Sequence, residues 1–156
     1  MRLLIVLLLY VLTPKIGLSQ NTKNFNVECA SLSNQGAILI TISKNRANAN
    51  YPSNRAIKDV ITVVLKTGFP GSSTCLTQAP LLKSSDELHK FNSISQEFYS
   101  SKGDWSKFGR VVERRDNVLV EGSAKKKREY VVSVLKEDLR KYLIEQEIIN
   151  PLIKGF

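Results

Sequence analysis

The segment that most restricts the fold is Ala37–Ser43, a run rich in β-branched residues. Alternation along an extended chain places its three isoleucines on one face, and Ala37, Leu39 and Thr41 on the other. Because both faces are largely apolar, the segment predicts a strand in the middle of a sheet rather than at its edge.

The segment that follows Pro52 has apolar residues at helical spacing, and proline is well suited to the first turn of a helix. The β-branched run Val60–Val64 leaves a strand open as the alternative. Lys66 and Gly68 form a typical helix end, and they favour the helix.

The spacing of apolar residues and the positions of turn-forming residues predict the secondary structure of the rest of the chain. Ser84 and Glu87 match a capping box, which marks the start of a helix. The residues Arg114–Asn117 are expected to turn the chain between two strands. The other predicted elements are a strand at 25–29, a loop at 69–83, a helix from 84 to about 102, strands at 107–113, 118–121 and 129–135, and a helix from 137 to 150.

The predicted element order is therefore β-β-α-α-β-β-β-α. This order is typical of an α+β domain, in which helices pack on one face of a largely antiparallel sheet. A chain of 156 residues suits one domain. We expect residues 20–156 to form that single α+β domain.

The first 19 residues have the pattern of a secretory signal peptide. A positive start at Arg2 precedes ten apolar residues, and the small residues Gly17 and Ser19 suit cleavage before Gln20. A membrane anchor is the alternative, but ten residues make about 15 Å of helix against a hydrocarbon core of about 30 Å. We therefore expect a chain exported to the periplasm or secreted, with no transmembrane segment after cleavage.

The chain has two cysteines, Cys29 and Cys75, and neither lies in a C-x-x-C motif. Lipoprotein anchoring is disfavoured, because it requires a cysteine at the cleavage position itself. An even pair in an oxidising compartment predicts one disulfide, and two buried free thiols are the alternative.

Catalytic and metal-binding patterns are mostly missing from the sequence. The single histidine, His89, has no histidine or cysteine at helical spacing, so the sequence predicts no metal site. There is no G-x-S-x-G elbow, phosphate-binding glycine loop or dinucleotide fingerprint, and we expect no cofactor. An enzyme would have to work through His89 together with a lysine or a carboxylate.

The formal charge of +9 falls to +7 when Arg2 and Lys15 leave with the signal peptide. A basic chain favours acidic partners. The predicted meander places Arg114-Arg115 and the run Lys125, Lys126, Lys127 and Arg128 at opposite ends of the sheet, about 15–20 Å apart. We expect the second run to contact an anion locally, or else to be a solvated turn, and we expect no nucleic-acid site.

Two stretches carry a resemblance to known proteins. They are Ala56–Gly71 with Ala79–Leu82 after it, and Leu139–Ile149 closing on Gly155-Phe156. Together they resemble a family of small exported bacterial proteins of unassigned function. The element order is also distantly similar to the small α+β domains of envelope lipoproteins that activate cell-wall synthases. These motifs are packing motifs, so the resemblance implies a fold and a compartment and assigns no functional residue.

These observations favour a non-enzymatic interaction module that binds a protein or an anionic component of the bacterial envelope. Two alternatives stay open. One is a secreted hydrolase of nucleic acid or wall polymer that uses His89, and the other is a secreted effector directed at a host.

Overall fold

The structure is a computed structural model, which describes residues 25–32, 37–44, 51–71, 75–119 and 126–151. The expected signal peptide and Lys125 lie outside these ranges. The described elements are, in chain order, β1 (Phe25–Leu32), β2 (Ile38–Lys44), α2 (Ser53–Lys66), α3 (Ser85–Phe98), α4 (Trp105–Phe108), β3 (Gly109–Leu119), β4 (Lys126–Val134) and α5 (Lys136–Glu145).

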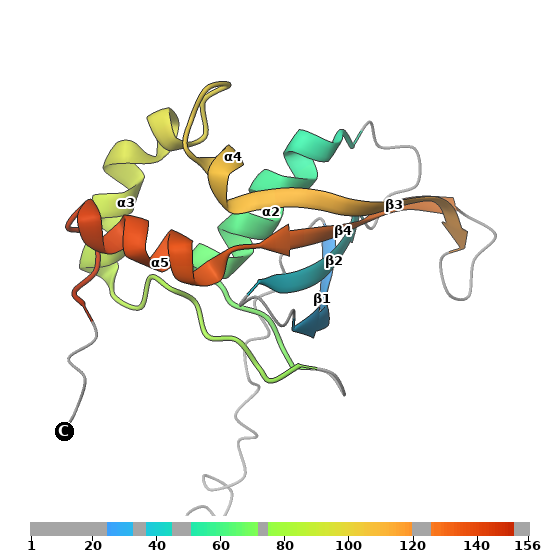
Figure 1. The fold of residues 1–156 in the computed structure, drawn as a ribbon, viewed down its shortest axis with the longest axis horizontal. Coiled ribbons are helices and arrows are strands. Elements are labelled where there is room, and N and C mark those ends of the chain that lie inside the picture. The colour runs from blue at the N-terminus through green and yellow to red at the C-terminus, as the bar shows by residue number, and fades with distance from the viewer. Residues whose placement is uncertain (1–24, 33–36, 45–50, 72–74, 120–125, 152–156) are drawn as a thin grey trace, which may run out of the picture.

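The four strands form one antiparallel sheet in the order β1-β2-β4-β3. The α+β class and the antiparallel sheet are confirmed. The run that contains Ile38–Lys44 forms β2, which lies between β1 and β4 as its two apolar faces predict. In Figure 1, α2 crosses the sheet on one side, and α3, α4 and α5 gather at the end where β3 begins and β4 ends.

The predicted turn at Arg114–Asn117 is wrong. Strand β3 runs without interruption from Gly109 to Leu119, so two strands lie where the sequence predicted three. The pairing of β3 with β4 shifts register between Arg115 and Val118, and Asn117 has φ 63°. A bulge of this kind absorbs extra residues without ending the strand, and asparagine tolerates the left-handed conformation. Helix α4 occupies the start of the segment expected to be a strand at 107–113.

Helix α2 covers the sheet and confirms the helical reading of the segment after Pro52. Pro52 is its N-cap residue, and Gly68 follows it with φ 66°. The side chains of Val60, Val64 and the three isoleucines of β2 are buried between the helix and the sheet. The helix lies close to the sheet at Gly109, because a Cβ atom there would lie 2.6 Å from Cγ2 of Ile57.

The sheet therefore has two distinct faces. We call the side of Ile40 and Val132 the α2 face, because the helix packs on it. We call the opposite side the outer face; it carries Leu39, Val131 and Ser133, whose positions alternate with those of Ile40, Val132 and the other residues that face α2.

The remaining helices close the core at one end. The capping box is present, since Glu87 N donates to Ser84 Oγ at 3.1 Å and Ser84 N donates to Glu87 Oε2 at 2.9 Å. Phe98 of α3 packs on Phe108 and Tyr142, with ring centroids 6.3 Å and 5.6 Å away. These aromatic contacts join α3, α4 and α5 into one apolar cluster.

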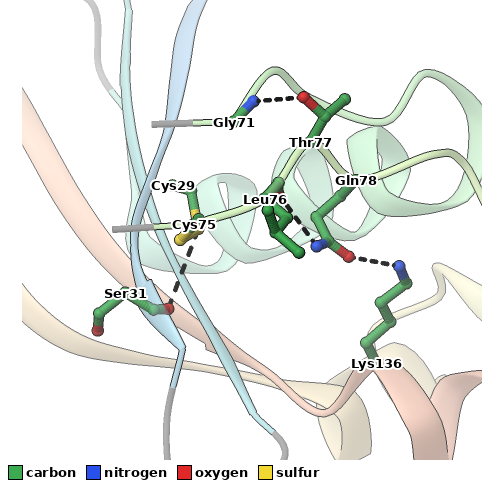
Figure 2. The surroundings of a disulfide bond; sticks show 8 residues. All are labelled: Cys29, Ser31, Gly71, Cys75, Leu76, Thr77, Gln78 and Lys136. Atoms are coloured by element: carbon green, nitrogen blue, oxygen red, sulfur yellow. Dashed lines mark hydrogen bonds between the residues drawn. A yellow bond between two sulfur atoms is a disulfide. The ribbon is translucent and has the colours of Figure 1, made fainter. Parts of the chain in front are cut away.

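The predicted disulfide is confirmed, and it ties β1 to the loop between α2 and α3 (Figure 2). Cys29 and Cys75 have Cα atoms 6.1 Å apart and are 46 positions apart in sequence. The same loop is held from the other side by α5, where Lys136 Nζ donates to Gln78 Oε1 at 2.7 Å. The loop is thus fastened both to the sheet and to the last described helix.

Within the described residues, no helix combines the length and the apolar character needed to cross a bilayer.

Candidate anion-binding hairpin

Strands β3 and β4 continue beyond the rest of the sheet as a two-stranded ribbon (Figure 1). The pairing of β2 with β4 reaches Ser43 opposite Glu129, whereas β3 continues along β4 to Leu119 opposite Lys126. We call the segments Glu113–Leu119 and Lys126–Glu129 the ribbon. The side chains of Arg114, Asp116 and Lys126 in this ribbon are exposed and available to a partner, whereas those of Lys127 and Glu129 are only 18% and 13% exposed.

The ribbon brings together the two basic runs that the sequence predicted to lie at opposite ends of the sheet. Arg115 lies directly opposite Glu129, and Arg128 Nε lies 2.6 Å from Asp116 Oδ1. The expected separation of about 15–20 Å is therefore wrong. Its cause is the misplaced turn: the strand continues through the first basic run and pairs with the second.

On the α2 face of the ribbon, two arginines share one carboxylate. Arg114 Nε lies 2.9 Å from Asp116 Oδ2, while Arg128 Nε approaches the other oxygen. All three side chains are between one third and about one half exposed. The guanidinium groups of Arg128 and Arg114 hold the pKa of Asp116 below its usual range, so this carboxylate stays charged.

On the outer face of the ribbon, the charges balance. Arg115 makes a two-pronged contact with Glu113, with both N···O distances 2.7 Å, and also lies 3.2 Å from Glu129. These contacts with Arg115 lower the pKa of Glu113. Lys127 Nζ donates to Ser43 Oγ at 2.9 Å and lies 3.6 Å from Glu129. Two cations therefore meet two acids on this face.

The unbalanced charge lies on the α2 face. Lys126 is exposed and shares this face with Arg128, because side chains two positions apart in a strand point to the same side. Among the described residues of the ribbon, three cations on this face, Arg114, Lys126 and Arg128, stand against one acid, Asp116. Of the four residues predicted from the sequence, Lys126 and Arg128 belong to this cluster, Lys127 belongs to the balanced outer face, and Lys125 lies outside the described residues.

Sequence reasoning set Arg114 apart from the second basic run and missed the role of Asp116. The strand register that joins Arg114 to Arg128 depends on the bulge, which local composition does not reveal. One signal was present: Asp116-Asn117 lies between Arg115 and the apolar pair Val118-Leu119, a pattern that suits a bulge as well as a turn.

Comparison with protein-family models, curated proteins and solved structures finds no match to this chain.

A second polar cluster is buried at the start of α2. Tyr51 Oη donates to Asp59 Oδ2 at 3.2 Å, and Arg55 Nε lies 3.0 Å from Asp59 Oδ1. Tyr130 Oη donates to the carbonyl oxygen of Tyr51 at 2.6 Å. Burial raises the pKa of Asp59, and the nearby Arg55 opposes this effect. The cluster fastens the chain before α2 to the helix and to β4, which is a structural role.

The residue on which the hydrolase alternative depends, His89, is exposed on α3. No hydrogen bond or ion pair of His89 occurs within the described part of the chain. Nor do the described residues contain a group of three or more histidine, cysteine, aspartate or glutamate side chains placed to hold a metal ion.

Trp105 is buried in α4. Its Nε1 donates to the carbonyl oxygen of Ser100 at 2.8 Å, and Lys58 Nζ lies 4.8 Å from its ring centroid. The indole therefore joins α2 to the α3–α4 connection.

Proposed function

We propose that this protein is an exported, non-enzymatic interaction module that binds an anionic partner through the ribbon of β3 and β4. The partner is a protein or an anionic component of the envelope. The observation that carries this proposal is the convergence of Arg114 and Arg128 on the single carboxylate of Asp116, with Lys126 on the same face.

The arrangement suits an anion for two reasons. First, Asp116 holds the two guanidinium groups in place, so little side-chain freedom is lost when they bind. Second, three N–H groups contact Asp116, whereas two guanidinium groups carry about ten between them. The donors left over suit phosphate or carboxylate oxygens.

Export is the second part of the proposal. A single disulfide between Cys29 and Cys75 is typical of an oxidising compartment, and the apolar run at the start of the sequence has the pattern of a signal peptide. An anionic polymer or lipid surface is abundant in the bacterial envelope, which makes it a natural partner for a basic exported domain.

The hydrolase alternative required a cleft with His89 and a second titratable group within hydrogen-bond reach. The exposed position of His89 on α3 gives this alternative no support. No observation favours the host-directed effector over the envelope module.

The direct test is binding to two probes, phosphatidylglycerol vesicles and polyglutamate, at low salt. Each charge near an anionic surface contributes severalfold to affinity, so the variant Arg114→Gln/Arg128→Gln should bind at least about tenfold more weakly. The matched control is Lys83→Gln/Lys102→Gln, which removes two exposed cations elsewhere and leaves the same net charge.

Binding to vesicles alone identifies a phosphate surface, and binding to polyglutamate identifies a carboxylate partner; either supports the proposal. Two results overturn it. The first is no binding of the wild-type protein to either probe. The second is an equal loss in the two double variants, which would show that only net charge matters.

A further inference from the structure

A hollow of about 440 Å³ lies on the outer face of the sheet, at the end away from the ribbon. Its floor comes from Leu39 and Ser133, which lie opposite each other on β2 and β4. Its walls come from the start of β3 and from Leu135, the residue that connects β4 to α5. None of the arginines of the ribbon lines it.

The hollow gathers exposed apolar side chains. Four large hydrophobic residues are strongly exposed within the described part of the chain, and two of them, Val112 and Leu135, line this hollow. Val112 is 47% exposed because a register shift between Val111 and Glu113 makes it the extra residue of a bulge. Bulges commonly redirect a side chain in this way, and here the side chain is directed toward the hollow.

One cation at the edge of the hollow is available to a ligand. Arg110 lies opposite Ser133 in the register and is exposed, and no ion pair of Arg110 occurs within the described residues. The second cation, Lys107, is bound to Asp104 at 2.6 Å. The hollow therefore combines the apolar side chains of Leu39, Val112 and Leu135 with the guanidinium group of Arg110, which forms no ion pair with any described residue.

We propose that this hollow binds a single-chain carboxylate amphiphile, such as the anion of a medium-chain fatty acid. The acyl chain would lie along Leu39, Val112 and Leu135, with its carboxylate against Arg110. This site is separate from the ribbon, and the inference does not depend on the proposed function.

Size and charge favour this occupant. The volume lies within the range of about 300–1,000 Å³ that small-molecule sites span, and such sites are mostly apolar with a few polar groups. A protein partner would need about 800 Å² of contact from each side, which a hollow of this size does not supply by itself. A single guanidinium group matches a single carboxylate.

The test is titration of the full chain with hexanoate, octanoate, decanoate and dodecanoate below their micelle concentrations, followed by calorimetry and by amide chemical shifts. Each added methylene should tighten binding about fourfold until the chain outgrows the hollow. An alkanol of the same length should bind about tenfold more weakly, because it lacks the charge that Arg110 recognises.

Two variants on the same strand provide a matched pair. Val112→Glu places a carboxylate in the hollow and should abolish binding. Leu119→Glu makes the same change at another exposed apolar position of β3, outside the hollow, and should leave binding unchanged. Arg110→Gln should remove the preference for the carboxylate over the alkanol.

Three results overturn the inference. They are the absence of saturable binding, an equal effect of Val112→Glu and Leu119→Glu, and chemical-shift changes that fall on the ribbon instead of around Leu39 and Ser133. A retained preference for the carboxylate in Arg110→Gln would assign the head group to another residue and would also contradict the proposal as stated.

Discussion

Arg114 and Arg128 lie on neighbouring strands and bind opposite oxygens of one carboxylate, that of Asp116, at N···O distances of 2.9 and 2.6 Å. The bulge in β3 makes this possible, because it allows the strand to continue through the first basic run and to pair with the second. The result is a cluster with excess positive charge on the α2 face of the ribbon.

Asp116 competes with any external anion for these two guanidinium groups. The variant Asp116→Asn removes the competing charge but keeps an amide oxygen that accepts from the guanidinium groups and orients them, so we expect it to bind phosphatidylglycerol vesicles or polyglutamate severalfold more tightly than the wild-type protein. Vesicle co-sedimentation and calorimetry measure the change. The midpoint of thermal unfolding should barely move, because exposed ion pairs contribute little to stability.

The control for this variant is Asp138→Asn, which removes one exposed acid from α5 and changes the net charge by the same amount. If both variants gain affinity equally, the effect belongs to net charge and the ribbon has no special part in it. Weaker binding in Asp116→Asn would show that orientation by Asp116 matters more than competition.

The disulfide should account for much of the stability of the fold. Closing a loop of 46 positions between Cys29 and Cys75 stabilises the folded state by about 4 kcal/mol in the chain-entropy treatment. We expect the free energy of unfolding of Cys29→Ala/Cys75→Ala, measured by urea denaturation, to be lower than that of the wild-type protein by about 4 kcal/mol. Reduction of the wild-type protein should give a similar loss, and a difference below about 1 kcal/mol would contradict the expected role.

The buried carboxyl of Asp59 should give a specific pH dependence. Burial raises its pKa in the folded state above the ordinary value of 3.8. The folded state therefore binds this proton more readily than the unfolded state, and the contribution of Asp59 to stability falls as pH rises from about 3.8 through the folded-state pKa. Above that value the contribution is constant.

This dependence is measured as the difference in free energy of unfolding between the wild-type protein and Asp59→Asn from pH 3.5 to 8. The amide keeps an acceptor for the hydroxyl of Tyr51 but does not titrate. As pH rises, the free energy of unfolding of the wild-type protein should fall relative to that of Asp59→Asn. If the free energy of unfolding of the wild-type protein instead rises relative to that of Asp59→Asn as pH increases, the attraction of Arg55 outweighs the effect of burial on the pKa of Asp59.

The elements that local sequence determines were predicted well. The capping box of Ser84 and Glu87 depends on residues three positions apart, and the end of α2 depends on Lys66 and Gly68. Side-chain alternation along the apolar run of β2, with apolar residues on both faces, was enough to predict that this strand lies between two others. The cysteine pair was predictable because only one pairing exists.

The candidate site was not predictable in the same way. Asp116 and Arg128 are 12 positions apart, and their contact depends on a strand register that the bulge sets. The polar run Arg114–Asn117 has the composition of a turn, and pairing with β4 overrides that local preference. Helix α4 has only four residues, too few for a periodic pattern to reveal it.

In the proposed function, Arg114 and Arg128 bind an anionic partner directly. The most direct measurement is the affinity for phosphatidylglycerol vesicles as a function of salt concentration, for the wild-type protein and for Arg114→Gln/Arg128→Gln. If both guanidinium groups contact the anion, the slope of log K against log salt should be shallower in the variant by about two charges. If the slope of Arg114→Gln/Arg128→Gln equals those of the wild-type protein and of the control Lys83→Gln/Lys102→Gln, the two arginines do not contact the anion and the proposed function is contradicted.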